Sequence, residues 1–439
     1  MVIGSMFGAL VGGLQCQFVG RKKSLIIDNV VIFGGLIALR FSYSIWSLLL
    51  CRFVLGFSVA SLFVNVPSYT GEICQPTIRM ITGSFAMVCN SFGMCSMMVI
   101  GAFLPWRTAI IVISAIPIFV IFLLIVLVPE SPIWLLMNNK HDEAKKSLVR
   151  LRGNMLVVES ELSRLQKSLI LQKAESQGKE EDGCCSGLRE IMDALKDESF
   201  LKPFSILLFL HCIGFEWIGL AFIAYYMVGI MIEANIPFSP YFVCAGISIF
   251  RLILIMIFSV GIANRVKRRP LYISTAVVII IGNTSMATYF LLKNNFTYVE
   301  SFPGLKWIPV ICILVIYAAF AFGYGCIPYM LQGEILPPYA RAVGSGLLGL
   351  ISNFSMFITL KVGPTISESI GMDGIFYMFS GVAIANAIFA YCTVPETFNL
   401  SLEEIEKIYQ SKDQRQKKPR KSRSASMISF YEVASPYGK

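Results

Sequence analysis

The sequence predicts an all-α integral membrane protein with two pseudo-symmetric helical bundles, and three observations support this. Of its 439 residues, 56% are hydrophobic and only 15% are charged, whereas soluble domains carry roughly a quarter of charged residues. Apolar stretches of about 18 residues or more recur along the chain, and each can cross a hydrocarbon core as a helix. A set of short motifs also occurs in the same order in both halves of the chain.

Eleven apolar stretches are expected to form transmembrane helices, five in the first half of the chain and six in the second. In lipid every backbone amide needs a partner within its own segment, which favours helices, and the alternating pattern of a membrane barrel is not present. The predicted spans are 1–20, 24–41, 45–69, 81–104, 107–128, 203–232, 238–262, 270–292, 305–332, 341–365 and 373–394.

The distribution of basic residues predicts the orientation. Lys and Arg gather in alternate loops, among them Arg21 to Lys23 and Arg265 to Arg269, which we therefore place in the cytoplasm. This topology accounts for the net charge of +10, so we expect no nucleic-acid partner. The sequon Asn295-Phe296-Thr297 falls on the opposite side, which makes Asn295 a candidate for glycosylation.

Four regions follow from this pattern: an N-terminal bundle (1–128), a cytoplasmic linker (129–202), a six-helix C-terminal bundle (203–394) and a basic cytoplasmic tail (395–439). Leucines at near-helical spacing within the linker predict amphipathic helices on the cytoplasmic face; they are Leu148, Leu151, Leu162, Leu165 and Leu169. The first bundle is one helix short of the second, so we expect a first helix to be missing. A protein of eleven helices is the alternative.

The clearest repeat pairs Gly71-Glu72-Ile73 with Gly333-Glu334-Ile335, and in each copy an arginine, Arg79 or Arg341, follows the glutamate by seven residues. Two further pairs keep the same order: Gly20-Arg21-Lys22 with Lys267-Arg268-Arg269, and Pro129-Glu130-Ser131 with Pro395-Glu396-Thr397. Two duplicated halves are a transporter architecture, in which the substrate is held between the halves near the middle of the membrane.

The charges at these motifs are expected to converge at the cytoplasmic helix ends as a gating network. Ion pairs there would form when the halves touch and break when water enters, which makes them a reversible latch. The alternative is that they only anchor loops. The network comprises Arg21, Arg52, Glu72, Arg79 and Glu130 in the first half, and Arg268, Arg269, Glu334, Arg341 and Glu396 in the second.

The motifs of both halves resemble those of the sugar-porter family of the major facilitator superfamily, and within it those of the insect facilitated trehalose transporters. The resemblance implies a major facilitator fold and the passive movement of a sugar, trehalose or a hexose, by alternating access at the plasma membrane. It covers the chain from the family's second helix onward. The matching segments are 20–22, Arg52 with Gly56, Pro67 with Tyr69 and Glu72, 129–135, 268–271, 323–337 and 395–406.

The positions that contact sugar in the family differ in this chain. A glutamine pair and a downstream asparagine are replaced by Phe215, Glu216 and Ala221, a further glutamine by Met87, and a tryptophan by Tyr329. A polyol needs several aligned donors and acceptors, because each hydroxyl left unpaired in a dry site costs about 1–3 kcal/mol. The candidate substrate-binding residues are Met87, Glu216, Tyr225, Tyr226, Arg251, Tyr329 and Asn353.

Glu216 and Arg251 lie within predicted spans, where a charge at the helix centre costs about 2.5–3.5 kcal/mol or more. We expect them to face the central cavity and either to pair across it or to bind a polar substrate. The alternative is a structural role for each. Asp28 is expected to lie nearer the end of its span and to reach the interface with its side chain.

Three classes of function are compatible with a membrane protein of this length. The first is a facilitative sugar carrier, and the second is a transport-inactive sugar sensor or a carrier of a different small polar solute. The third, a membrane enzyme, is disfavoured because the sequence shows no phosphate loop, metal-ligand cluster or nucleophile constellation. We therefore expect no enzymatic activity, cofactor or metal, and as partners only the sugar and the lipid bilayer, with no obligate protein partner.

Overall fold

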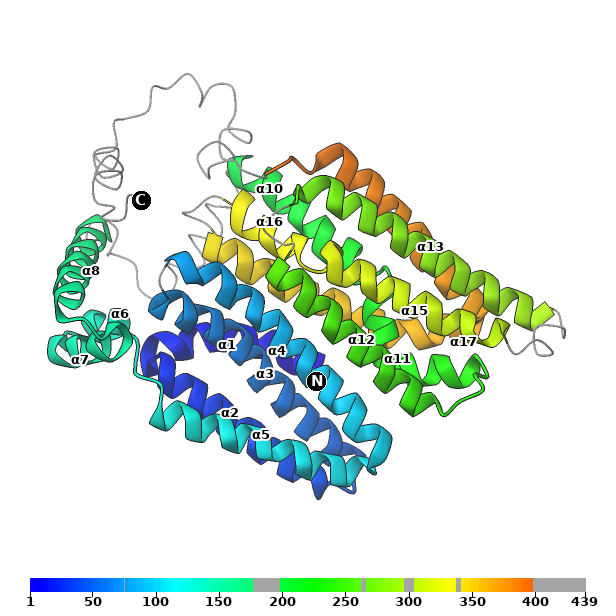
Figure 1. The fold of residues 1–439 in the computed structure, drawn as a ribbon, viewed down its shortest axis with the longest axis horizontal. Helices are drawn as coiled ribbons and strands as arrows, with labels where there is room; N and C mark the ends of the chain where they lie inside the picture. The colour runs from blue at the N-terminus through cyan, green and yellow to red at the C-terminus, as the bar shows by residue number, and fades with distance from the viewer. Residues whose placement is uncertain (75, 177–197, 262–265, 296–303, 337–340, 398–439) are drawn as a thin grey trace.

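The structure, a computed structural model, describes residues 1–74, 76–176, 198–261, 266–295, 304–336 and 341–397. Within these ranges the regular elements are helices, arranged in two groups with shorter helices at one end (Figure 1). The N half contains α1 (Val2–Val19), α2 (Arg21–Arg40), α3 (Ile45–Ile73), α4 (Pro76–Phe103) and α5 (Trp106–Val126). The C half contains α10 (Glu198–Leu208), η1 (Phe209–Phe215), α11 (Leu220–Glu233), α12 (Pro240–Gly261), α13 (Arg268–Asn295), η2 (Leu305–Trp307), α15 (Ile308–Ala319), η3 (Phe320–Tyr324), α16 (Ile327–Ile335) and α17 (Arg341–Thr393).

Each predicted span lies mainly on helix in the residues that the structure describes. Seven helical stretches are long and apolar enough to cross a membrane, and two shorter apolar helices accompany them. The last two predicted spans form the two limbs of α17, which bends at Gly371, where φ is +81°. The prediction of a helical membrane protein is confirmed, whereas the number of eleven crossings stays a prediction.

The helix that follows the linker is interrupted between η1 and α11. Gly219 ends the interruption with φ of +91°, and a Cβ added there would lie 2.5 Å from the ring of Phe379. Such a conformation and such a close contact both favour glycine. Side chains from α17 and α13 satisfy the freed carbonyls: Ser355 Oγ donates to Cys212 O over 2.7 Å, and Asn283 Nδ2 donates to Ile218 O over 3.0 Å.

Helices of the two halves contact each other along two pairs. Helix α1 packs against α17, and α4 packs against α12, which lies beside it in Figure 1. Within the N half, α1 approaches α3 closely, since a Cβ at Gly4 would lie 2.1 Å from the backbone oxygen of Phe53. Small residues such as Gly4 at a helix–helix contact allow the two backbones to approach closely in lipid.

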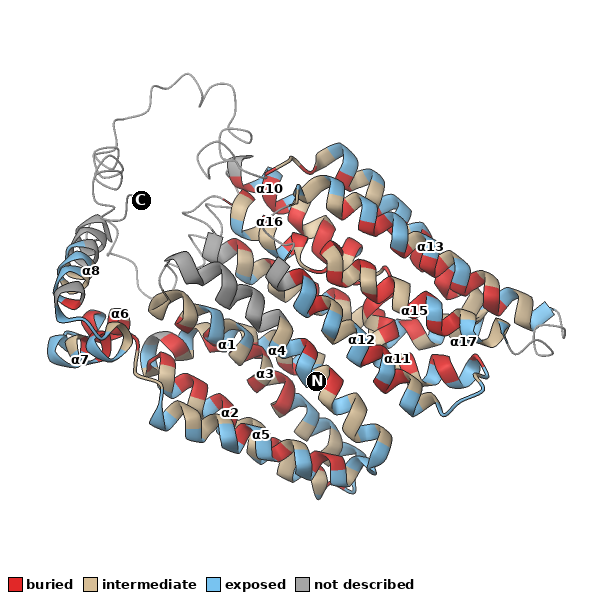
Figure 2. Ribbon diagram, viewed as in Figure 1, coloured by how far each residue is buried: buried red, intermediate tan, exposed pale blue. Residues whose placement is uncertain are grey.

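Burial is uneven between the halves. Buried residues are dense in the C half and sparser in the N half (Figure 2), where one small apolar cluster is formed by Leu39, Leu55 and Ile110. In the most apolar part of the spans Phe200–Glu233 and Leu305–Ile335, 56% and 61% of the residues are buried, compared with 28% in α3. The C half is therefore the better packed of the two.

The linker forms three helices beyond the end of the N half, α6 (Pro132–Met137), α7 (His141–Arg152) and α8 (Met155–Ser176). Leu162 and Leu165 of α8 pack on an apolar cluster of α6 and α7, and Leu148 is fully buried. The prediction of amphipathic helices is confirmed for these residues, whereas the side chain of Leu169 lies outside the described residues.

Candidate transport site and gating network

The repeated motifs meet at one end of the N half. Arg21, the first residue of α2, donates from Nη2 to Glu72 Oε1 over 2.7 Å and from Nε to both carboxylate oxygens at 2.9 and 3.0 Å. The two side chains are only 10% and 15% exposed. Ser131 also donates to Glu72. A bidentate, largely buried arginine–carboxylate pair is the strong form of this interaction.

The glutamate of each Pro-Glu motif binds the N-terminus of a helix. Glu130 Oε1 accepts from the backbone amide of Lys22 over 2.9 Å. In the C half, Glu396 accepts from the amides of Arg268 and Arg269 over 3.1 and 3.3 Å. A carboxylate there satisfies amides that lack a helical partner and interacts favourably with the helix dipole.

The C half repeats the ion pair as well. Arg268 Nη2 lies 2.6 Å from Glu334 Oε1, and these side chains are 17% and 22% exposed. Arg268 begins α13 as Arg21 begins α2, so each half places an arginine at a helix start against the glutamate of its Gly-Glu-Ile motif.

The structure thus brings together Arg21, Glu72 and Glu130, and separately Arg268, Arg269, Glu334 and Glu396. The ion pairs among the described residues join partners within one half or within the linker. The side chains of Arg79 and Arg341 lie outside the described residues, and the latch between the halves remains a prediction.

Arg52 does not belong to this network, which corrects the expectation. It precedes Glu72 by twenty residues on the same helix α3, a separation of about 30 Å at 1.5 Å per residue. It lies instead within electrostatic range of the N-terminus and of Tyr225 in the C half. Helix length alone excludes its contact with the Gly-Glu-Ile motif.

Glu216 lies in the interruption between η1 and α11. Its side chain is 5% exposed, and Ser352 Oγ of α17 donates to its Oε1 over 3.3 Å. The hydroxyls of Tyr225 and Tyr329 lie within electrostatic range of its carboxylate. The broken helix thus holds a buried carboxylate whose hydrogen bond comes from α17.

Tyr225 and Tyr329 are 55% and 45% exposed although both lie within predicted spans. Tyr225 is within range of Arg52 in the N half, so its exposed ring faces the junction of the halves. The ring of Tyr329 makes edge contacts with His211, with centroids 4.9 Å apart, and with Phe215, 5.9 Å apart.

Asn353 lies at the junction of the halves, beside Ser352 on α17. Its Oδ1 accepts a hydrogen bond from Ser5 Oγ of α1 over 3.1 Å. Tyr226 is directed elsewhere, because its hydroxyl donates to Leu360 O over 3.0 Å within the C half. The side chain of Met87 lies outside the described residues.

Arg251 of α12 also lies at the junction. Its Nη1 donates to Met94 Sδ of α4 over 3.4 Å, and its guanidinium lies 5.1 and 5.2 Å from the ring centroids of Tyr317 and Phe320. Its Nε has no hydrogen-bond partner among the described residues. The expected pairing with Glu216 is not among the ion pairs of the described chain, since Arg251 is held by aromatic rings instead.

The predicted position of Asp28 in the N half is wrong. Asp28 is 2% exposed and accepts hydrogen bonds from Gln15, Ser61 and Asn65, so it does not reach the membrane surface as expected. The rule that a charge inside a span marks a functional position would have identified it.

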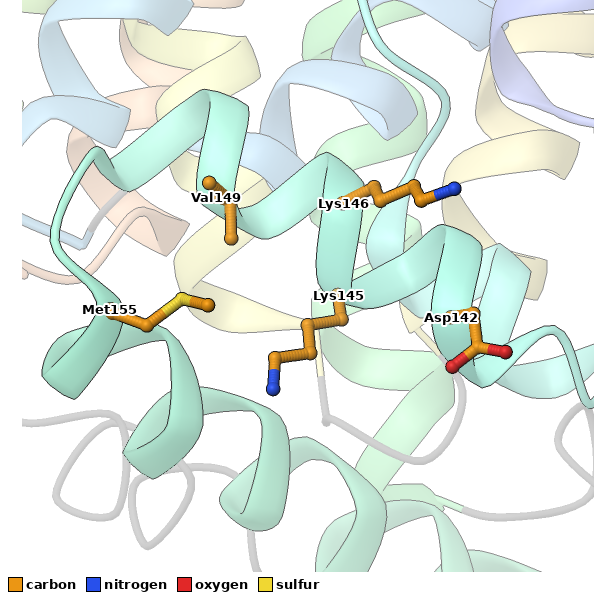
Figure 3. A pocket seen from close by; sticks show the side chains of 5 residues that line it. All are labelled: Asp142, Lys145, Lys146, Val149 and Met155. Atoms are coloured by element: carbon orange, nitrogen blue, oxygen red, sulfur yellow. The ribbon is translucent and has the colours of Figure 1, made fainter.

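Two further features lie away from the junction. Asn295 is exposed at the end of α13, and its Nδ2 donates to Leu291 O over 3.0 Å, whereas the rest of the sequon is outside the described residues. A hollow on the linker surface lies between α7 and α8 (Figure 3), lined by Asp142, Lys145, Lys146, Val149 and Met155. Its charged rim and its position in the linker separate it from the transport site.

Two helical halves that meet along two helix pairs, with polar side chains at the junction, define a multi-pass membrane protein of the major facilitator type. The comparison with known proteins is more specific: the chain belongs to the Sugar (and other) transporter family, which it matches over residues 1–409.

Insect proteins are among its relatives of known name. The chain is 28% identical over 408 residues to the facilitated trehalose transporter Tret1 of Anopheles gambiae, covering 93% of this chain and 49% of that protein. It is 26% identical to the Tret1-2 homolog of Drosophila simulans, covering 93% and 80%. The chain therefore spans about half the length of the mosquito relative.

Solved structures support the fold. The inward-open xylose transporter XylE of E. coli superposes with a TM-score of 0.69 at 20% identity, covering 93% of this chain and 87% of that one. The same protein described as a proton:xylose symporter bound to 6-bromo-6-deoxy-D-glucose gives 0.68 at 19% identity.

Proposed function

We propose that this chain carries a sugar, trehalose or a hexose, passively across the plasma membrane by alternating access. The N half (1–128) and the C half (203–394) would move against each other, with the tail (395–439) in the cytoplasm. No bond is made or broken, so the protein is not an enzyme in this proposal. The family and the trehalose transporters among its relatives support the substrate class.

The observation that carries the proposal is the position of polar side chains where the halves meet. In the C half, Glu216 lies within electrostatic range of Tyr225 and of Tyr329, and Asn353 bonds across to α1. Carboxylate, phenol and amide groups provide the acceptors and donors that a sugar requires. A substrate bound to both halves would shift the balance between open states by its differential affinity for them.

The cytoplasmic network would serve as the latch. Glu334 uses Oε1 for Arg268, while its buried Oε2 has no hydrogen-bond partner among the described residues. That oxygen is available to a cation of the N half when the halves close. We propose Arg79 and Arg341 as members of the same latch, on the basis of their motif positions.

A second candidate function is the transport of a different small polar solute, one that carries charge. Arg251 lies at the junction and Glu216 in the interruption between η1 and α11, and neither has an ion-pair partner in the described chain. The sugar-contacting glutamines of the family are also replaced. Buried charges of both signs suit a zwitterion or an organic ion better than they suit a neutral polyol. A sensor without transport activity is the remaining alternative.

Uptake into liposomes that contain the purified chain tests the first function. Radiolabelled trehalose and glucose should enter down their gradients and saturate, and Glu216→Gln should lower the rate about tenfold or more, as expected for the loss of a hydrogen bond made by a charged group. Glu143→Gln, in the exposed linker helix α7, is the matched control and should transport normally. Binding of sugar without uptake would identify a sensor, and uptake of charged solutes alone would support the second candidate.

The latch is tested by measuring distances between spin labels at the cytoplasmic ends of the two halves. Glu334→Gln should increase the population in which these ends are apart, because the carboxylate can no longer attract a cation of the other half. Glu143→Gln again serves as the control. An unchanged distance distribution in Glu334→Gln would show that the pair only anchors its loop.

A further inference from the structure

Asp28 is a carboxylate buried in the middle of the N half. It lies two turns into α2 and is 2% exposed. Ser61 Oγ and Asn65 Nδ2 of α3 donate to its Oδ2 over 2.9 and 2.8 Å, and Gln15 Nε2 of α1 donates to its Oδ1 over 3.3 Å. Three helices thus converge on one carboxylate.

The charge of this carboxylate is not balanced by a cation within the described chain. The ion pairs there do not include Asp28. On its own helix, Arg21 is bound to Glu72, and Lys22 donates to the carbonyl of Ile125. The groups that face it from α1 and α3 are neutral amides and hydroxyls, and a buried charge without a counter-ion is costly.

Two oxygen atoms beside Asp28 have no hydrogen-bond partner in the described part of the chain. They are Ser24 Oγ, one helical turn before Asp28 on the same face, and Asn65 Oδ1, on the amide that already bonds Asp28. Both residues are fully buried. Buried polar atoms are nearly always satisfied in native proteins, so these two indicate a missing binding partner.

We propose that Asp28, Ser24, Ser61, Asn65 and Gln15 form a binding site for a sodium ion inside the N half. Hard cations bind carboxylate, hydroxyl and amide oxygens, which are the groups present. Rotating the terminal amide of Asn65 or Gln15 by 180° exchanges nitrogen for oxygen in the same place, so both can turn an oxygen toward the ion.

The composition of the site selects the ion. One carboxylate neutralises one positive charge, whereas a divalent cation would leave a net charge buried in the membrane. Asn65 Nδ2 donates to Ser61 Oγ over 3.2 Å, and both groups donate to Asp28 Oδ2, so the oxygen atoms are close together, which favours a small ion. A proton would need a single acceptor and would leave the oxygens of Ser24 and of the amides unused.

Sodium at this site would act on the contact between the halves. Gln15 belongs to α1, the helix that packs against α17 and bonds Asn353 through Ser5. Binding would draw α1 toward α2 and α3. The inference does not depend on which solute is transported.

Thermal unfolding of the purified full chain in detergent tests the site. The unfolding temperature should rise and saturate as Na⁺ replaces K⁺ at constant ionic strength and pH, since a ligand that binds only the folded state stabilises it. Asp28→Asn should abolish this dependence. Ser61→Ala should weaken the apparent affinity for Na⁺ about tenfold, which corresponds to the loss of one bond to a charged group.

Ser58→Ala is the matched control, because Ser58 is equally buried one turn earlier on α3 and is not a partner of Asp28. Equilibrium binding of radioactive Na⁺ to the wild type and to Ser61→Ala gives a second readout if Asp28→Asn does not fold. Equal stabilisation by Na⁺ and K⁺, or a Na⁺ response retained in Asp28→Asn, would overturn the proposal. A response to pH but not to Na⁺ that Asp28→Asn removes would assign a proton site instead.

Discussion

The two halves have the same arrangement of ion pairs at their helix ends, but their buried polar groups differ. At one end, each half pairs an arginine at a helix start with the glutamate of a Gly-Glu-Ile motif, Arg21 with Glu72 and Arg268 with Glu334. Inside, the N half buries the charged residue Asp28 among neutral polar groups. The C half buries a carboxylate too, that of Glu216, but this one accepts a single hydrogen bond, from Ser352. Elsewhere the C half packs neutral side chains together, where Asn386 donates to the hydroxyls of Tyr272 and Tyr324.

This difference shows that the repeated motifs determine where helices begin and how their ends are held, and that they do not determine which groups are buried inside each half. The pairs at the ends fix where α2 and α13 begin, and they require the same residue types in both halves. The interior of a bundle only has to satisfy its own polar groups and fill its volume. It can therefore diverge, and in this chain it does so at the positions that we propose for ion and substrate binding.

The largest effect is expected at the N-terminal ion pair. Arg21→Ala should destabilise the protein by about 3 kcal/mol, because it leaves the carboxylate of Glu72 buried and unpaired. Arg268→Ala should cost less, since its pair is more exposed, at 17% and 22% against 10% and 15%. Denaturant unfolding in detergent measures both. The double variant Arg21→Ala/Glu72→Ala should recover part of the lost stability. Equal destabilisation by Arg21→Ala and Arg268→Ala would show that the exposure of the two ion pairs does not control their contribution.

A smaller loss is expected in the interior of the C half. Asn386→Ala should lower the unfolding free energy by about 2 kcal/mol, because two buried tyrosine hydroxyls lose the amide that donates to them and a cavity remains, while Tyr324 keeps its bond to Gly214 O. The same variant should keep the Na⁺ dependence of the unfolding temperature, since Asn386 lies in the other half. Tyr272→Phe, which removes only one of these bonds, should cost about half as much.

Local stability should also differ between the halves. Backbone amides of α3 and α5 should exchange hydrogen faster than those of α13 and α15, because fewer of their side chains are buried and local opening exposes less apolar surface. Hydrogen–deuterium exchange with mass spectrometry checks this order. Equal protection of the backbone amides of both halves against exchange would show that side-chain burial does not control their local unfolding.

The smallest effect is expected where the linker meets the N half. Arg152 binds both oxygens of Glu161 over 2.8 Å and donates to Ile73 O of α3 over 3.1 Å, and the bond to Glu161 raises the pKa of Arg152. Arg152→Ala should cost about 1 kcal/mol, because Glu161 is 28% exposed and water can replace its lost partner, and should speed limited proteolysis within 129–202. Lys145→Ala, which removes an exposed ion pair, should leave the rate of cleavage unchanged.

Several features of this protein were predictable from the sequence. Hydropathy located the seven helical stretches that are long and apolar enough to cross a membrane in the described chain, because a helix in lipid must be long and apolar wherever it packs. The repeats identified the residues of both ion pairs, since they stand at helix ends that the motifs themselves define. Arg52 shows the limit of motif matching: it belongs to the same fourth-helix signature as Glu72, yet twenty residues of helix separate the two.

The partners of buried groups were decided only by the tertiary structure. Asp28, Ser61 and Gln15 lie on three different helices, and no local pattern indicates that they meet. Tyr225 and Tyr226 are adjacent in sequence, yet one faces the junction and the other bonds the backbone of α17. Hydropathy and motifs determined which segments are helical and where they end. Which face of each helix meets which neighbour depends on the packing of side chains far apart in the chain.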